Sequence, residues 1–179
     1  MRISDRQKEI LKTIGVCALL AGAIIAPNIV QLLKPLNSKK KYKYKQLIKK
    51  LANDKIIYLF GEKIELTKKG RELLKRIQIE EITIEYPDKW DGIWHLVSYD
   101  IPENKKPERD FFRRKIIELG FKAIQDSLWV IPYNCKEEIA VISQTLGISP
   151  FVAYLNTDSL PQQKNLIRFF KLNSYQDEK

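Results

Sequence analysis

A run of apolar, aromatic and β-branched residues in the middle of the chain predicts a buried strand. The run covers residues 94–102 and passes from Trp94 to an acidic residue, Asp100, and then to Pro102. Such side chains favour strands, and a proline marks the point where strand pairing stops. We therefore expect a strand inside a sheet, with the Asp100 carboxylate presented at its end.

The hydrophobic pattern after this strand alternates between helical and strand periods. Apolar positions recur at helical spacing in residues 107–119 and 134–146, and a glycine follows each segment. Short strand-like runs occupy residues 121–125, 128–132 and 151–157, with a turn between the first two. The resulting order is β-α-β-β-α-β, the ferredoxin-like arrangement, in which two helices cover one face of a four-stranded sheet.

Several residues of this half have expected structural roles. The core-facing stripe of the first helix consists of Phe112, Ile116 and Leu119. Asn134 is a suitable N-cap for the second helix. The single histidine, His95, lies within the first strand, where we expect a structural role and not a catalytic one. After Pro161, a short helix is expected to dock on the sheet or on a second subunit through Leu166, Ile167, Phe169 and Phe170.

The first half opens with basic residues followed by an uncharged, strongly apolar segment. Residues 14–26 are almost wholly apolar, a pattern that a signal peptide or a membrane anchor also shows. This stretch is 13 residues long, shorter than the about 20 residues that span a bilayer, and Pro27 interrupts the longer run. We expect a buried helix. Its core-facing residues would be Ile10, Leu11, Ile14, Leu20, Ile24 and Ile25.

The next helical segment carries an apolar stripe on one side and lysines on the other. The stripe consists of Tyr44, Leu47, Ile48 and Leu51. Asn37 or Ser38 could cap this helix. Two short strands, 56–60 and 63–66, follow with a glycine turn, and Thr67 is then a suitable N-cap for another helix. This order of helices, hairpin and helix is typical of a winged helix-turn-helix domain, in which the helix before the hairpin enters the DNA major groove.

The expected architecture is therefore α+β with two domains. Residues 1–80 would form the winged helix-turn-helix domain, and residues 88–179 would form the ferredoxin-like domain. An acidic segment between them, with glutamates at positions 80, 81 and 85, marks the joint.

Charge is distributed unequally between the two halves. Residues 1–89 contain 20 basic and 10 acidic side chains, whereas residues 90–179 contain 12 of each. An excess of positive charge that is confined to the first half indicates that this half contacts a polyanion. The expected DNA-binding residues are Lys39, Lys40, Lys41, Tyr42, Lys43, Lys45, Gln46, Lys49, Lys50 and Lys63. The alternative is a solvated basic helix without a partner.

The sequence lacks most of the motifs that carry chemistry. It has no Gly-rich phosphate loop, no His/Cys metal cluster and no Ser-His-Asp set. The two cysteines, Cys17 and Cys135, provide neither a disulfide framework nor zinc spacing, and we expect them to be reduced thiols in a cytoplasmic protein. No cofactor is expected on these grounds.

Several segments of the second half together resemble a known family. They are residues 90–94, 99–102, 118–121 and 125–133, together with the helix that carries Arg109, Arg113 and Arg114. In order and spacing they resemble the central domain of PaaX-type transcriptional repressors, which is itself similar to the CRISPR-associated endonuclease Cas2. This resemblance covers roughly residues 90–158. The first half resembles, more loosely, the N-terminal winged-helix domain of the same proteins.

The resemblance gives Asp100 two alternative roles. The matching aspartate of Cas2 is the proposed metal ligand, and a dimer brings two of them around one Mg²⁺ ion, which prefers oxygen ligands. Alternatively, Asp100 caps the loop after the strand or pairs with an arginine such as Arg113. We expect the second, structural role, and Mg²⁺ would be a cofactor only under the first.

Together these patterns predict a DNA-binding transcriptional regulator, a PaaX-like repressor that acts as a homodimer through its second half. The alternative is a Cas2-like metal-dependent endonuclease, or a non-catalytic subunit of a CRISPR spacer-acquisition complex. The third hypothesis is a membrane-attached basic protein. Longer PaaX-type proteins carry a further C-terminal domain and respond to an aryl-CoA ligand; we do not expect that domain here, and a small-molecule effector stays open.

Overall fold

The computed structural model describes residues 3–20, 37–61, 63–161 and 163–172, without the side chains of residues 17–20. The chain divides into two compact units, Met1–Gln78 and Ile79–Lys179. Among the helices described, none is long and apolar enough to cross a membrane. The prediction that Leu20, Ile24 and Ile25 face a core concerns side chains outside the described set.

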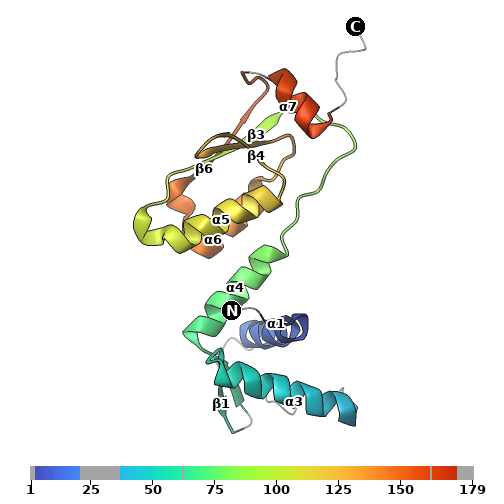
Figure 1. Ribbon diagram of the computed structural model, residues 1–179, viewed down its shortest axis with the longest axis vertical. Helices are drawn as coiled ribbons and strands as arrows, with labels where there is room; N and C mark the ends of the chain where they lie inside the picture. The colour runs from blue at the N-terminus through green and yellow to red at the C-terminus, as the bar shows by residue number, and fades with distance from the viewer. Residues whose placement is uncertain (1–2, 21–36, 62, 162, 173–179) are drawn as a thin grey trace. The chain divides into compact units, whose positions relative to one another are not determined.

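Helices and one β-hairpin make up the first unit (Figure 1). The elements are α1 (Asp5–Leu20), α3 (Ser38–Asn53), β1 (Ile57–Phe60), β2 (Lys63–Leu66) and α4 (Lys68–Glu80), whose last two residues belong to the second unit. One apolar core joins them. It contains Ile10, Leu11, Ile14, Ile48, Leu51, Ile56, Ile57, Ile64, Leu74 and Ile77. The expected burial of Ile10, Leu11 and Ile14 is confirmed.

The junction between the hairpin and α4 is tightly built around Thr67. Its hydroxyl accepts a hydrogen bond from the Gly70 backbone N–H at 2.9 Å, which confirms Thr67 as the cap of α4. The same hydroxyl lies 2.8 Å from the Lys55 carbonyl oxygen and 3.0 Å from that of Ile56. A Cβ atom at position 70 would collide with the Ile56 carbonyl oxygen. Glycine at this position therefore lets α4 approach the backbone just before β1 closely.

The second unit has the predicted β-α-β-β-α-β order. Its elements are β3 (Trp94–Tyr99), η1 (Glu103–Lys105), α5 (Lys106–Glu118), β4 (Lys122–Gln125), β5 (Leu128–Ile131), α6 (Lys136–Leu146), η2 (Ser149–Phe151), β6 (Val152–Thr157) and α7 (Gln163–Phe170). The four strands form an antiparallel sheet in the order β4-β5-β3-β6. This is the ferredoxin-like arrangement, so the fold prediction for this half is confirmed.

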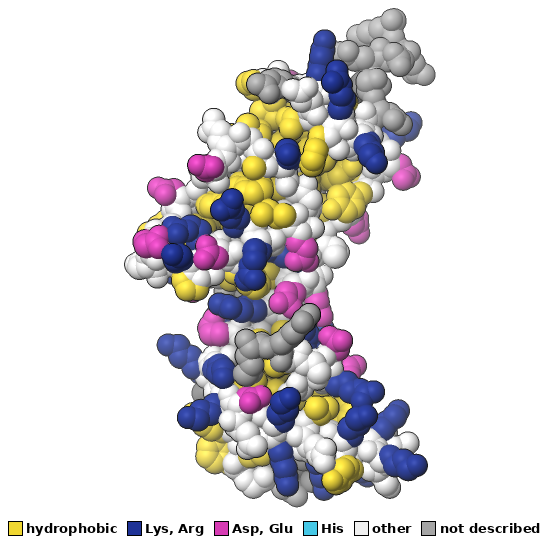
Figure 2. Space-filling model, in the orientation of Figure 1, with side chains coloured by type: hydrophobic (Ala, Val, Ile, Leu, Met, Phe, Trp, Pro, Cys, Tyr) yellow, Lys and Arg dark blue, Asp and Glu magenta, His cyan; other side chains and the backbone are white. Residues whose placement is uncertain are grey.

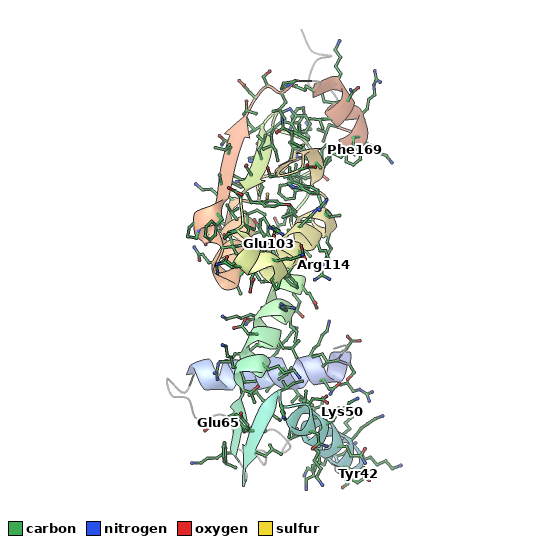
Figure 3. All side chains as sticks on the ribbon, turned by 60° about the vertical axis from the view of Figure 1, so that its left-hand side comes forward. Tyr42, Lys50, Glu65, Glu103, Arg114 and Phe169 are labelled. Atoms are coloured by element: carbon green, nitrogen blue, oxygen red, sulfur yellow. The ribbon has the colours of Figure 1, made fainter. Side chains whose placement is uncertain are left out.

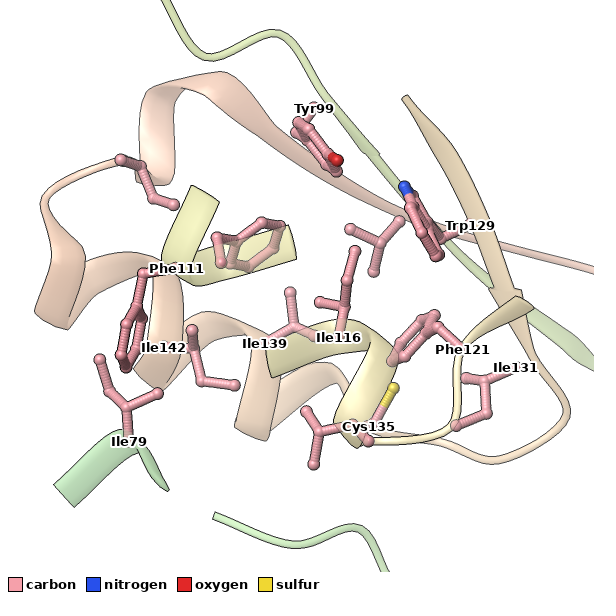
Figure 4. Packing of buried hydrophobic residues seen from close by; sticks show 14 of the residues in the cluster. Ile79, Tyr99, Phe111, Ile116, Phe121, Trp129, Ile131, Cys135, Ile139 and Ile142 are labelled. Carbon is pink, nitrogen blue, oxygen red and sulfur yellow. The ribbon is translucent and has the colours of Figure 1, made fainter. Parts of the chain in front are cut away.

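Apolar side chains cover both faces of this sheet. On one face, α5 and α6 pack against β3 and β5, and the side chains in Figure 4 include Tyr99, Trp129, Ile116 and Ile142. Phe112, Ile116 and Leu119 are all buried, as their helical spacing predicts. On the opposite face, Trp94, Leu96 and Val130 are covered by α7 through Leu166, Ile167 and Phe170. Of the two alternatives for the tail helix, docking on the sheet is the one observed; Phe169 is exposed.

One predicted cap in this unit is wrong. The N-cap of α6 is Cys135, which makes no side-chain cap, and not Asn134. The Asn134 side chain instead accepts hydrogen bonds from the Lys136 N–H at 3.3 Å and the Tyr154 hydroxyl at 3.2 Å. Tyr154, on β6, therefore shares the Asn134 side-chain oxygen, which the local sequence pattern alone assigns to the cap of α6.

Candidate nucleic-acid interface

Helix α3 begins with a good cap and an unfavourable charge distribution. The Asn37 side chain accepts a hydrogen bond from the Lys40 N–H at 3.1 Å, which makes Asn37 the N-cap. The first turn then contains Lys39, Lys40 and Lys41 and no acidic residue. Cations at the positive end of a helix dipole cost about 0.3–1 kcal/mol each. These lysines therefore do not stabilise the helix. An anion bound at this N-terminus would be stabilised by the helix dipole and by the lysines.

The apolar and basic sides of α3 are separated as the spacing predicts. Ile48 and Leu51 are buried, and Tyr44 and Leu47 pack partly buried against the same core. All nine expected DNA-binding residues of this helix are exposed: Lys39, Lys40, Lys41, Tyr42, Lys43, Lys45, Gln46, Lys49 and Lys50. Tyr42 and Lys50 are labelled along the helix in Figure 3.

The charges on α3 are not neutralised within the described part of the chain. There, none of its exposed lysine side chains forms an ion pair or a side-chain hydrogen bond. The first unit contains 19 basic and 6 acidic residues. In Figure 2, lysine and arginine side chains are spread over the unit that contains α3. This surface can bind a polyanion without first breaking an internal ion pair.

The tenth expected residue, Lys63, lies on the hairpin and not on α3. It is exposed and pairs in register with Phe60. Phe60 and its neighbour on the same strand, Tyr58, are both largely exposed, at 59% and 53%. The two rings lie with their centroids 6.0 Å apart. The structure therefore places one predicted cation beside an aromatic pair that the sequence analysis did not single out.

The sequence signal for this aromatic pair was hidden by its neighbours. Residues 56–60 form an unbroken apolar run, which is typical of a strand buried on both faces. Only Ile56 and Ile57 are buried. The strand belongs to a hairpin with a single packed face, so alternate side chains point to solvent.

Two further cations of the first unit have structural partners. Lys69 donates a hydrogen bond from its ammonium group to the Asp54 carbonyl oxygen at 2.8 Å. The Arg71 guanidinium donates to the Leu66 carbonyl oxygen at 2.7 Å. Both bonds hold α4 against the segments that flank the hairpin, which distinguishes these residues from the lysines of α3.

Asp100 lies at the end of β3 without the expected side-chain partner. Its backbone N–H donates to the Phe151 carbonyl oxygen at 2.9 Å, but its exposed carboxylate makes no hydrogen bond or ion pair with any described residue. Arg113 instead lies over the Trp129 ring, 6.0 Å from its centroid. The predicted loop cap and arginine pair of Asp100 are therefore not formed. Within the described ranges, no three His, Cys, Asp or Glu residues gather as metal ligands.

His95 has the structural environment that its place in the strand predicts. It is 5% exposed, and its Nδ1 atom lies 2.9 Å from the Tyr154 hydroxyl. Burial lowers the pKa of His95 below its ordinary value of 6.5, and the nearby Asp91 charge opposes this only in part. Burial likewise raises the pKa of the Cys135 thiol to about 12. Burial therefore favours the uncharged form of both groups.

Comparison with known proteins identifies the second unit. Residues 87–167 match the family described as the PaaX protein central Cas2-like domain. The matched range contains the whole four-stranded sheet and the two helices, α5 and α6, that pack on one of its faces. No curated protein matches the chain. Over these residues, the second unit is therefore similar to the central Cas2-like domain of PaaX proteins.

Proposed function

We propose that the chain is a DNA-binding transcriptional regulator of the PaaX type, in which the first unit is a winged helix-turn-helix domain. The observation that carries the proposal is the exposed lysine face of α3, which has no acidic residue in its first turn and no ion pair with any described residue. The central Cas2-like domain supports the family context.

The order of elements around α3 supports its assignment as the recognition helix. It directly precedes the β1–β2 hairpin, and α4 follows the hairpin. In winged helix-turn-helix proteins, the helix in this position lies in the DNA major groove. A helix of 16 residues is about 24 Å long, which is enough to contact base edges and both flanking phosphate strands.

The exposed face of α3 has two parts with different expected roles. Lys43 and Gln46 form one row along the exposed side of the helix, where a bidentate contact to base edges is possible. Lys45 and Lys49 form a second exposed row, one turn apart, which suits contacts to phosphates. The two pairs should therefore differ in how they affect sequence preference and salt dependence.

A homodimer through the second unit is part of the proposal. Strands β4 and β6 are the edges of the sheet, and exposed edges can pair with another chain. Ile124 on β4 and Leu155 on β6 are 40% and 55% exposed. A two-fold dimer would present two copies of α3 to DNA. Light scattering at tens of micromolar should give twice the chain mass of 21.0 kDa, and a monomer mass would refute this part.

The test of DNA binding compares matched pairs of lysines by fluorescence anisotropy with a 30-base-pair duplex of mixed sequence. Lys45→Ala with Lys49→Ala should weaken binding and reduce the log–log salt slope by roughly 1 to 2, because each neutralised phosphate contributes about −0.9. Lys136→Ala with Lys164→Ala removes the same charge from exposed positions of the second unit and should change neither quantity. Equal effects of the two pairs would contradict a specific role for α3.

The exposed Asp100 carboxylate, which has no side-chain partner among the described residues, favours a second candidate function, a Mg²⁺-dependent nuclease. Its exposure, together with the Cas2-like domain, is compatible with a metal ligand supplied by each subunit of a dimer. Hydrolysis of DNA or RNA that requires Mg²⁺ and is lost in Asp100→Asn, at unchanged melting temperature, would support the nuclease. Duplex binding without hydrolysis would leave the regulator as the function.

A further inference from the structure

A pocket of about 170 Å³ lies in the second unit, beside α5. Two acidic and two basic side chains surround one aromatic ring in its lining, which consists of Glu80, Phe111, Arg114, Lys115 and Glu118. All five residues belong to the second unit. None of them is part of the lysine face of α3 or contacts Asp100, so neither of the functions considered above uses this pocket.

Lys115 is a charged side chain that the fold buries almost completely, since it is only 3% exposed. Its ammonium group donates one hydrogen bond to the Glu80 carbonyl oxygen and one to the Glu118 carboxylate, each at 2.9 Å. An ammonium group has three N–H donors, and the third has no acceptor among the described residues. A buried donor without a partner is unfavourable, so an acceptor bound in the pocket would stabilise this group.

Arg114 and Glu118 lie one turn apart on α5, at the spacing at which opposite charges usually pair. They form no ion pair with each other, because Glu118 binds Lys115 and the Arg114 guanidinium lies over the Phe111 ring, 5.5 Å from its centroid. Within the described residues the guanidinium makes one hydrogen bond, from Nε to the Asp110 carbonyl oxygen at 3.4 Å. Its Nη donors and the second carboxylate oxygen of Glu118 are therefore available to a molecule in the pocket.

These groups identify the chemistry that fits the pocket. Arg114 and Lys115 have unused N–H donors and suit a carboxylate, which a guanidinium binds through two parallel hydrogen bonds. The unused oxygen of Glu118 suits an ammonium group. A purely anionic molecule would also meet the negative charges of Glu80 and Glu118, whereas a molecule with one charge of each sign leaves the pocket balanced. The Phe111 ring supplies an apolar wall.

The size of the pocket restricts the class of molecule further. A cavity of about 150 Å³ in another protein encloses one benzene molecule, and this pocket is only slightly larger. Pockets that enclose drug-sized molecules have volumes of roughly 300–1,000 Å³. A nucleotide or a coenzyme is therefore too large to be enclosed here. An α-amino acid of moderate size carries a carboxylate and an ammonium group on one carbon atom and matches the pocket in both size and charge.

We propose that this pocket binds a free α-amino acid with an apolar side chain. The carboxylate of the amino acid contacts Arg114 and Lys115, its ammonium group contacts Glu118, and its side chain packs against Phe111. Because Lys115 also binds the carbonyl oxygen of the last residue of α4, the bound amino acid stabilises the end of this helix as well. The proposal is independent of the proposed DNA-binding function, and its test contains no DNA.

The test is isothermal titration calorimetry of the full chain at pH 7 with L-valine, L-leucine and L-methionine. At least one of them should bind with a dissociation constant of about 1 mM or lower. For the tightest binder, two analogues test both charges: the acid that lacks its ammonium group and the amine that lacks its carboxylate, which for L-leucine are 4-methylpentanoate and 3-methylbutylamine. Each analogue should bind about tenfold more weakly or worse. Binding of none of the three amino acids, or equally tight binding of either analogue, would overturn the proposal.

Matched variants locate the binding within the chain. Arg114→Gln removes the two-point contact to the carboxylate and should weaken binding by about tenfold or more. Glu118→Gln keeps an acceptor for Lys115 and removes the charge that faces the ammonium group, so it should weaken binding similarly. Arg113→Gln is the control, because Arg113 is exposed on the same helix but lies over the Trp129 ring and does not line the pocket. Unchanged binding in either pocket variant, or an equal loss in Arg113→Gln, would overturn the assignment.

Discussion

Replacing Tyr154 by phenylalanine should destabilise the second unit strongly, because one hydroxyl serves three neighbours. It accepts a hydrogen bond from the buried Cys135 N–H at 3.2 Å, and it lies 2.9 Å from His95 Nδ1 and 3.2 Å from the Asn134 side-chain oxygen. Asn134 is exposed and can bind water instead. The N–H of Cys135 and the imidazole of His95 cannot, and each buried group left without a partner costs about 1–3 kcal/mol.

The expected loss of unfolding free energy for Tyr154→Phe is therefore about 2–4 kcal/mol, or about 10 °C or more in melting temperature for a unit of this size. Tryptophan fluorescence reports on this unit alone, because Trp90, Trp94 and Trp129 all lie within it. Tyr86→Phe is the matched control. Tyr86 is 58% exposed and donates one hydrogen bond to the Leu119 carbonyl oxygen, so its loss should cost less than about 1 kcal/mol. A Tyr154→Phe variant within about 0.5 kcal/mol of wild type would refute this reasoning.

Two further predictions concern pH and backbone packing. Because burial holds the pKa of His95 below 6.5, the unfolded chain binds a proton that the folded chain does not as pH falls below that value. The contribution of neutral His95 to the free energy of unfolding is therefore complete above pH 6.5 and is lost as pH falls toward the pKa of the folded state. In urea titrations, the free energy of unfolding should fall less between pH 7.5 and 5 for His95→Asn than for wild type. Equal losses in the two proteins would contradict this prediction. Gly70→Ala should lower the melting temperature, because the new methyl group meets the Ile56 carbonyl oxygen. A higher melting temperature, as helix propensity alone predicts, would show that the contact relaxes.

Helices and strands that bury one face could be predicted from sequence, because their buried apolar residues repeat with the period of the helix or strand. The stripe of α3 and the buried residues of α5 repeat at helical spacing, and β3 is buried at five of its six positions. Local patterns of this kind identify elements before any tertiary contact is known. They were sufficient for the β-α-β-β-α-β order and for the exposed lysine face of α3.

The parts that failed depend on tertiary partners that no local pattern encodes. Asn134 was assigned to a helix cap, but the Tyr154 hydroxyl, 20 residues further along the chain, shares its side-chain oxygen. Asp100 was assigned an arginine partner, but Arg113 lies over the Trp129 ring. The direction in which a long charged side chain turns is decided by such neighbours.

The aromatic face of the hairpin was missed for a different reason. A continuous apolar run gives no alternation, so the exposed and buried positions of β1 cannot be separated by sequence. Its pairing with β2 assigns Tyr58 and Phe60 to the outer face. The lysine face of α3 was therefore predictable from sequence, and the exposed aromatic pair on β1 was not.

The most direct measurement of the central claim is photocrosslinking from α3 to duplex DNA. Gln46, exposed on the lysine face, is replaced by p-benzoylphenylalanine, and Glu137, exposed on α6, is replaced in the same way as a control. With a mixed-sequence duplex at low salt, irradiation should yield a protein–DNA crosslink from position 46, reduced by added salt, and little from position 137. Crosslinking from position 137 but not from position 46 would contradict the assignment of α3 as the recognition helix.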